Sequence, residues 1–238
     1  MGSSNDFENI IVSLADQFYC LAVDLPGHGK TQVFAGEESY TMPNTAQALI
    51  YLLDKLSIEK CYLVGYSMGG RLALYLALHF PSRFCKVVLE SASPGLKDIQ
   101  EQVLRIKADS QLAQELETNN FYSFLLNWYN QPIFQHLNKH PKFADLLQSR
   151  LGNHPLELAK SLRQMGTGSQ PSLWDKLEYN EIPLLLLVGE YDHKFKAINA
   201  EIALRCKVAE IRIVKNCGHN IHFEDMDVWI RYVKEFCQ

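Results

Sequence analysis

Short apolar runs alternate with longer segments of helical periodicity along most of the chain. The apolar runs predict strands, because they are four to eight residues long and rich in branched side chains. These runs are 19–24, 60–65, 86–90, 183–189 and 209–214. Apolar positions at helical spacing predict helices over 41–56, 68–79, 197–206 and 228–236. This alternation predicts an α/β fold, with a mostly parallel sheet and helices on both of its faces.

Residues 97–175 interrupt the alternation. The segment is amphipathic and aromatic, with Phe121, Phe124, Trp128 and Tyr129, and it contains no strand-like run. An insertion of this kind is expected to form a helical cap over the carboxyl ends of the strands, where α/β proteins bind ligands. The sequence therefore predicts a core of residues 1–96 and 176–238 and a helical cap insertion of residues 97–175.

Composition narrows the class of protein. A chain of 238 residues suits one α/β domain with an insertion, and 47% hydrophobic residues suffice for a large core. A net charge of −4 argues against nucleic acid as a partner. No apolar run approaches a membrane span, and the start lacks the basic and apolar parts of a signal peptide. The six cysteines form no metal-binding spacing, which favours reduced thiols in a cytoplasmic protein.

The pattern G-x-S-x-G occurs at Gly65-Tyr66-Ser67-Met68-Gly69, between a predicted strand and a predicted helix. That context is typical of a nucleophile elbow, the strained turn that exposes the serine of an α/β-hydrolase fold above the sheet. We therefore expect Ser67 to be the reactive group. The backbone N–H of Met68, at the start of the helix, is the expected oxyanion donor. The alternative is an ordinary turn between strand and helix.

A serine hydroxyl needs a base to take its proton, and His219 is the best candidate among eight histidines. It follows the last predicted strand, in Cys217-Gly218-His219-Asn220, where this fold places its base. His222 is the rival base.

The imidazole in turn needs a carboxylate to hold its tautomer. Asp192 follows the strand that ends at Gly189 and is the predicted acid. Glu190 and Glu90 are competitors, since both also follow strands. A purely structural reading of Asp192 is the N-cap of the next helix.

Basic side chains flank these residues. Arg71 lies four positions after Ser67, one turn into an otherwise apolar helix, so its charge needs a partner. Arg105 and Arg150 lie in the predicted cap. Because the planar fork of arginine suits carboxylates, an anionic small substrate is favoured over a neutral lipid. Each cap arginine alone is also compatible with an ordinary solvated surface.

Several motifs together resemble one family. They are residues 65–71 (Gly-Tyr-Ser-Met-Gly-Gly-Arg), 90–96 (Glu-Ser-Ala-Ser-Pro-Gly-Leu), 128–134 (Trp-Tyr-Asn-Gln-Pro-Ile-Phe), 162–171 (Leu-Arg-Gln-Met-Gly-Thr-Gly-Ser-Gln-Pro), 189–195 (Gly-Glu-Tyr-Asp-His-Lys-Phe) and 217–222 (Cys-Gly-His-Asn-Ile-His). In these motifs nearly the whole chain resembles the 2-succinyl-6-hydroxy-2,4-cyclohexadiene-1-carboxylate synthases of menaquinone and phylloquinone biosynthesis. The elbow arginine and the cap motifs are its more specific parts.

The resemblance implies a carbon–oxygen lyase without metal or organic cofactor. Its substrate carries three carboxylates, and the serine–histidine pair removes a ring proton so that pyruvate is eliminated. Arg71, Arg105 and Arg150 match the carboxylate-binding arginines, and Tyr66 and Trp128 match residues that line the pocket. A serine hydrolase of an ester or a C–C bond and a non-catalytic homologue are the alternatives.

One part of the family pattern is absent. The family carries His-Gly-Phe at the end of a strand just before the stretch that matches Met1–Phe7. Backbone there supplies part of the oxyanion hole. We therefore expect N-terminal strands and one oxyanion donor to be missing from this sequence. A chain extended upstream is expected to be more soluble and more active.

Overall fold

The computed structural model describes residues 1–238. The chain forms two compact units, each built from two stretches of sequence. Residues 46–99 and 170–238 make up one of them, here called the sheet unit. Residues 1–45 and 100–169 make up the other, here called the helical unit. The predicted cap, 97–175, overlaps the second stretch of the helical unit, and its placement over the sheet stays a prediction.

The sheet unit contains four strands, all parallel, in the spatial order β1-β2-β3-β4. Their bounds are β1 Cys61–Tyr66, β2 Phe84–Glu90, β3 Leu184–Gly189 and β4 Ala209–Val214. Strand β3 lies inside the sheet, and all its residues are buried, which explains its uninterrupted apolar sequence. Because the strands are parallel, their carboxyl ends all lie at the same edge of the sheet. The loops that carry Ser67, Asp192 and His219 therefore start from one edge.

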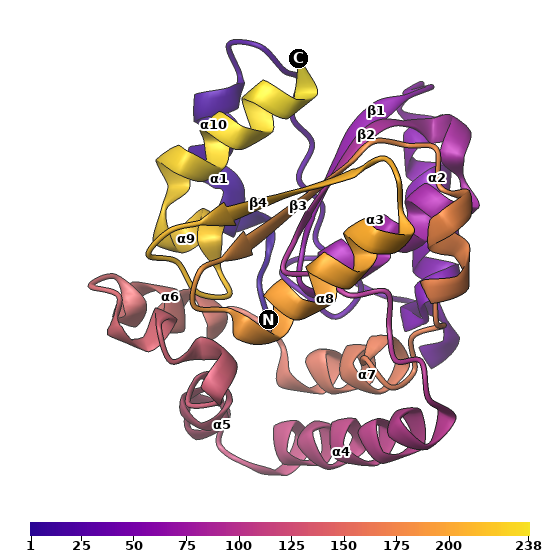
Figure 1. Ribbon diagram of the computed structural model, residues 1–238. Coiled ribbons are helices and arrows are strands. Elements are labelled where there is room, and N and C mark those ends of the chain that lie inside the picture. Colours follow the sequence, from indigo (N-terminus) through magenta and orange to yellow (C-terminus); the bar gives the residue numbers. More distant parts are fainter. The chain divides into compact units, whose positions relative to one another are not determined.

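Helices cover both faces of this sheet. Helices α3 (Met68–His79) and α8 (His193–Arg205) lie on one face, and α10 (Met226–Cys237) lies on the other (Figure 1). On the α10 side, Lys86 Nζ donates to the Phe236 carbonyl at 2.7 Å. The short helix α9 (Ile221–Glu224) precedes α10, and α2 (Met42–Lys55) precedes β1. These elements confirm the predicted α/β class.

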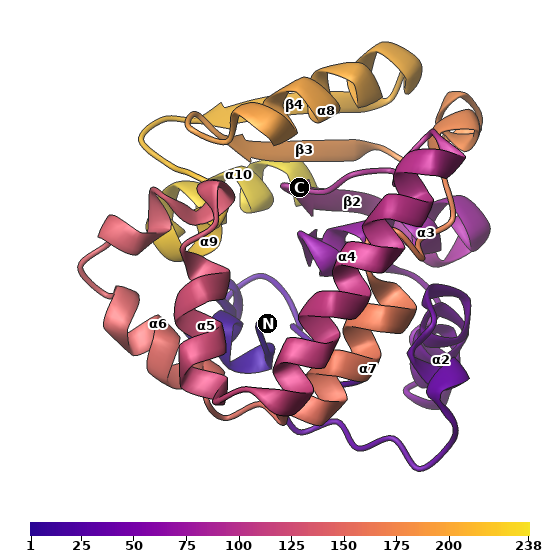
Figure 2. The same cartoon turned by 90° about the horizontal axis from the view of Figure 1, so that it is seen from below.

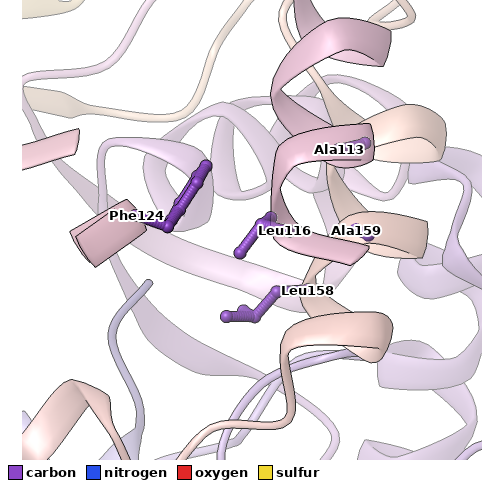
Figure 3. Close-up of a cluster of buried hydrophobic side chains, with 5 residues drawn as sticks. All are labelled: Ala113, Leu116, Phe124, Leu158 and Ala159. Atoms are coloured by element: carbon purple, nitrogen blue, oxygen red, sulfur yellow. The ribbon is translucent and has the colours of Figure 1, made fainter. Parts of the chain in front are cut away.

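The helical unit contains α1 (Glu8–Leu14), α5 (Phe121–Tyr129), α6 (Phe143–Arg150), α7 (Pro155–Met165) and most of α4 (Ile99–Thr118). Helix α4 lies beside α7 (Figure 2). One buried cluster joins α4, α5 and α7 through Ala113, Leu116, Phe124, Leu158 and Ala159 (Figure 3). Small residues at two of these positions let the helices approach closely. Shorter 3-10 helices are Ser4–Phe7, Glu37–Tyr40, Pro81–Arg83, Pro132–Phe134, Leu137–Lys139 and Trp174–Tyr179.

Most predicted elements are confirmed, but the strand predicted over 19–24 is wrong. That segment is irregular, and Tyr19 and Leu21 are 90% and 46% exposed. A strand exists through the ladder it forms with a neighbour, and no strand of the sheet pairs with this segment. Its last residue, Asp24, instead accepts hydrogen bonds from the backbone of Ser4 and Lys30. Helix α8 begins at His193, four residues earlier than predicted, because Asp192 caps it.

No helix combines the length and the hydropathy that a membrane span requires. All six cysteines are free; Cys206, Cys217 and Cys237 are buried, and Cys85 is exposed.

Candidate active site

Ser67 occupies a strained turn between β1 and α3. Its φ of 48° and ψ of −106° are rare for a side chain with a Cβ. The turn is held at both ends, since the Ser67 N–H donates to the Glu90 carbonyl and the Ser67 carbonyl accepts from the Arg71 N–H. A Cβ at Gly65 would lie 2.4 Å from the Gly69 carbonyl oxygen, so only glycine permits this close approach.

The side chains of Ser67, His219 and Asp192 form one chain of hydrogen bonds. His219 Nε2 lies 3.1 Å from Ser67 Oγ, and His219 Nδ1 lies 2.6 Å from Asp192 Oδ2. Asp192 and His219 are 5% and 2% exposed, whereas Ser67 is half-buried. A base buried behind an accessible hydroxyl, with its second nitrogen on a carboxylate, can take the serine proton in the required tautomer.

Asp192 performs two tasks at once. Its Oδ1 accepts from the Phe195 N–H at 3.2 Å and so caps α8, while its Oδ2 contacts His219. The N-cap and the histidine-orienting role are therefore not alternatives in this fold. The cap fixes the carboxylate in the orientation that the imidazole needs.

The rival residues lie elsewhere. His222 Nδ1 lies 2.8 Å from Glu90 Oε2, and both side chains are buried. Glu190 accepts from the backbone N–H of Asn216 at 3.0 Å. His219 Nδ1 thus contacts Asp192, and Glu90 pairs with the second histidine.

Two aromatic rings pack against the base. The centroids of the Tyr66 and His219 rings are 5.4 Å apart, and those of Phe195 and His219 are 4.8 Å apart. The rings of Tyr66 and His222 form a T-shaped contact, with their centroids 4.7 Å apart. These apolar contacts restrict the rotation of the imidazole. They place Tyr66, a predicted pocket residue, beside the base.

Arg71 is buried one turn after Ser67, with 8% exposure. Its Nη1 donates to Gln170 Oε1 at 2.9 Å, and Gln170 Nε2 donates to the Ser93 carbonyl at 3.2 Å. The partner offered by Gln170 is a neutral amide, which orients the guanidinium. A buried and oriented guanidinium therefore lies in the first turn of the elbow helix, and its role as the partner of an anion stays a prediction.

Two further predicted arginines lie in the helical unit. Arg105 Nε donates to the buried Asp109 at 2.8 Å. Arg150 is 3% exposed, with Nη1 at 2.6 Å from Asp6 and Nε at 3.0 Å from the Tyr129 hydroxyl. Both charges are thus held by carboxylates of the same unit.

Trp128 is half-buried and packs against the cluster of Figure 3. The centroid of its ring lies 6.1 Å from that of Phe124 in a stacked arrangement. Because the ring rests on this core, its orientation within the helical unit is fixed by packing.

The side chains that hold the three arginines were not predicted from the sequence. They are Gln170 for Arg71, Asp109 for Arg105 and Asp6 for Arg150. Asp109 sits four residues after Arg105 on one helix, a spacing that signals an ion pair. Gln170 and Asp6 lie far from their partners in sequence, and only the fold brings them together. No group of three or more histidine, cysteine or acidic side chains is arranged to hold a metal ion.

The parallel sheet, the strained serine turn and the hydrogen-bonded serine, histidine and aspartate define the class of protein. The family model described as "alpha/beta hydrolase fold" matches residues 1–226. A hydrolase from Pseudomonas aeruginosa PA01 has a TM-score of 0.80 at 22% identity, which extends the likeness in fold.

Within this class the chain is similar to a narrower family. The 2-succinyl-6-hydroxy-2,4-cyclohexadiene-1-carboxylate synthase of Serratia proteamaculans (strain 568) is 31% identical over 237 residues, covering 99% of this chain and 89% of that protein. A Bacillus subtilis (strain 168) protein provisionally named for the same synthase is 38% identical over 91% of this chain and 80% of its own length. The structure of MenH from S. aureus has a TM-score of 0.94 at 34% identity, covering 98% of this chain and 88% of that one.

The chain therefore belongs to the α/β-hydrolase fold family and, within it, to the family of 2-succinyl-6-hydroxy-2,4-cyclohexadiene-1-carboxylate synthases.

Proposed function

We propose that this protein is a carbon–oxygen lyase that eliminates pyruvate from 2-succinyl-5-enolpyruvyl-6-hydroxy-3-cyclohexene-1-carboxylate. The product is 2-succinyl-6-hydroxy-2,4-cyclohexadiene-1-carboxylate, an intermediate on the way to menaquinone or phylloquinone. The observation that carries the proposal is the Ser67–His219–Asp192 chain of hydrogen bonds, one helical turn from the buried Arg71. Membership of the synthase family supports it.

The chemistry begins with loss of a ring proton. The Ser67–His219 pair takes the proton, since His219 Nε2 faces Ser67 Oγ at 3.1 Å and Asp192 stabilises the imidazolium that forms. The electron pair of the broken C–H bond at C2 forms the C2=C3 double bond, and the existing C3=C4 double bond shifts to C4=C5. This shift breaks the C5–O bond to the enolpyruvyl group, and the leaving enolate takes up a proton to become pyruvate. The N–H of Met68, the first residue of α3, would stabilise negative charge that develops near Ser67.

Anionic groups of the substrate are the proposed partners of the arginines. Arg71 would bind a carboxylate of the substrate, because Gln170 orients its planar guanidinium one helical turn after Ser67. Arg105 and Arg150 are the proposed partners of the other carboxylates, and Tyr66 and Trp128 the proposed apolar walls. A buried arginine beside the elbow suits an anionic substrate better than a neutral ester, which favours the lyase over a simple ester hydrolase.

The test is release of pyruvate from the enolpyruvyl substrate, followed by coupled oxidation of NADH with lactate dehydrogenase. Wild-type protein is expected to release one pyruvate per substrate, and Ser67→Ala to release almost none. Ser172→Ala, at an exposed position of the same unit, is the matched control and is expected to retain full activity. Hydrolysis of neutral esters without pyruvate release from this substrate would overturn the proposal.

We further propose that the protein acts in the cytoplasm on a small anionic substrate, with neither nucleic acid nor membrane as a partner. The net charge of −4 and the lack of a helix suited to a membrane span support this.

A further inference from the structure

The loop that carries the base, residues 216–222 and here called the His219 loop, is hydrogen-bonded to acidic side chains through its backbone. The N–H groups of Gly218 and Asn220, on either side of His219, donate to Glu224 Oε2 at 2.7 Å and to Oε1 at 3.1 Å. The next two N–H groups, of Ile221 and His222, donate to Glu90 Oε1 at 2.6 and 3.2 Å. Two carboxylates thus accept four of the loop's backbone donors.

Glu90 connects this loop to the serine turn. Its backbone carbonyl accepts the Ser67 N–H at 2.8 Å, and its fully buried carboxylate accepts from the loop. Glu90 Oε2 also lies 2.8 Å from both His222 Nδ1 and Trp229 Nε1. A single residue therefore fixes both ends of the 3.1 Å contact between Ser67 Oγ and His219 Nε2.

Carboxylates suit this task better than neutral groups. Each offers two oxygens that accept several N–H donors, and hydrogen bonds to a charged acceptor are about twice as strong as neutral ones. The part of the loop before α9 has no regular secondary structure of its own to hold His219. Because a displacement of about 1 Å can cost about 100-fold in rate, this support has consequences for the reaction.

We propose that Glu90 and Glu224 are positioning residues that hold His219 at bonding distance from Ser67. They accept the backbone donors of the His219 loop and do not touch the reacting atoms. The inference concerns the site of the proposed lyase. Its test includes a readout that does not depend on the lyase reaction.

The test replaces each carboxylate by an amide of the same shape. In Glu224→Gln, the new NH2 group meets either the Gly218 or the Asn220 N–H, so one donor faces another. In Glu90→Gln, the NH2 group meets either the loop amides or the Trp229 Nε1–H. Glu235→Gln, an exposed substitution on α10, is the matched control.

Four quantities are measured on each variant. They are kcat and KM for pyruvate release, the rate at which a fluorophosphonate labels Ser67, and the low-field proton resonance of His219 Nδ1–H, assigned by its loss in His219→Ala. In the labelling reaction Ser67 Oγ bonds to phosphorus, fluoride leaves and His219 takes the hydroxyl proton. Labelling therefore reports on the Ser67–His219 pair without the natural substrate.

We expect Glu224→Gln to lower kcat and the labelling rate by about 10- to 100-fold, with KM nearly unchanged and the low-field resonance shifted or broadened. Glu90→Gln should lose at least as much, and Glu235→Gln should match the wild type. If the wild type is labelled but releases no pyruvate, the proposed function fails, and the labelling rates still decide the positioning role.

Unchanged kcat, labelling and resonance in Glu224→Gln, with only a lower melting temperature, would overturn the proposal. In that case the carboxylates would support the fold alone. Should Glu90→Gln fail to fold, Glu224→Gln decides, because Glu224 is only partly buried. A wild-type chain that neither labels nor releases pyruvate would also overturn it, since there would be no working base to position.

Discussion

The two units hold their candidate functional side chains in different ways. In the sheet unit, Ser67, Asp192 and His219 each follow a parallel strand, and backbone hydrogen bonds at the carboxyl edge fix the turns that carry them. In the helical unit, Arg105 and Arg150 are positioned by carboxylates, at 2.8 Å from Asp109 and 2.6 Å from Asp6.

In the proposed function, this difference separates the residues that transfer a proton from the arginines that bind the substrate. Groups that move a proton need a fixed geometry, and a sheet edge supplies it with few degrees of freedom. Long arginine side chains lose rotamer entropy when they are ordered, and an ion pair orders them before a ligand arrives. We therefore expect changes in the sheet-edge triad to lower kcat, and changes to the arginine anchors to raise KM.

The largest effects are expected at the proton relay. Ser67→Ala and His219→Ala should each lower kcat by about 10²- to 10⁴-fold, the usual contribution of a positioned acid–base group. The double variant should be hardly worse than either single one, because residues that act as a unit are not additive. Pyruvate release by the three variants is the measurement, and losses that multiply in the double variant would contradict a relay.

Asp192→Asn comes next. The fold should persist, since an asparagine oxygen still caps α8, while the imidazole is left in the wrong tautomer. We expect kcat to fall by about 100-fold or more, with a melting temperature close to that of the wild type. Near-normal turnover would show that another carboxylate orients His219, and Glu90 and Glu190 would be the next to test.

Substitutions that weaken the binding of substrate carboxylates by the arginines should raise KM. Arg71→Lys removes the planar fork and should weaken transition-state binding by about 1.5–3 kcal/mol, the worth of a charge-assisted hydrogen bond. Asp109→Asn, which loosens Arg105, should raise KM by a smaller factor with little change in kcat. Steady-state kinetics with the tricarboxylate substrate are decisive, and unchanged kinetics for Arg71→Lys would remove carboxylate binding from its roles.

The stability of the protein in acid should depend on His28 in the helical unit. Burial lowers the pKa of His28 to about 3, below the usual value of 6.5 in the unfolded chain. Between these two values the unfolded state binds more protons, so the free energy of unfolding falls as pH is lowered from about 6.5 towards 3, by up to about 1.4 kcal/mol per pH unit.

Chemical denaturation over this range measures the slope. His28→Gln should flatten it, whereas His154→Gln, at an exposed position of the same unit, should leave it unchanged. Equal slopes in the wild type and His28→Gln would show that His28 is not the group responsible.

The smallest effect is expected at the cysteines of the sheet unit. Burial, with nearby Glu224 adding to it, raises the pKa of Cys217 to about 12, so almost no thiolate exists at pH 8. Iodoacetamide should modify the exposed Cys85 and leave Cys217 intact, without loss of activity. Peptide mass spectrometry reads the sites, and rapid alkylation of Cys217 would show that the His219 loop opens to solvent.

Local sequence signals were enough for the sheet and the triad. The elbow glycines with Ser67 lie within five residues. Asp192 follows an uninterrupted apolar strand, and His219 follows a strand in which apolar residues alternate with Glu210 and Arg212. Such signals depend on backbone conformation and strand burial, which the nearby sequence determines.

Features that depend on contacts between residues far apart in the sequence were predicted wrongly or not at all. The apolar run 19–24 has the composition of a strand but no neighbour to pair with. Gln170 reaches Arg71 across 99 positions, and Glu90 reaches the His219 loop across more than 130. The sequence makes Glu90 a competitor for the role of the acid, because its position after a strand is visible there. The direction in which its side chain points is not visible in the sequence.

The decisive test of the proposed lyase is the release of pyruvate from 2-succinyl-5-enolpyruvyl-6-hydroxy-3-cyclohexene-1-carboxylate by wild-type protein and by His219→Ala in parallel. We expect stoichiometric pyruvate with the wild type and a rate lower by about 10²- to 10⁴-fold in the variant. Equal rates in the two proteins, or no pyruvate from a wild-type chain that melts cooperatively, would contradict it.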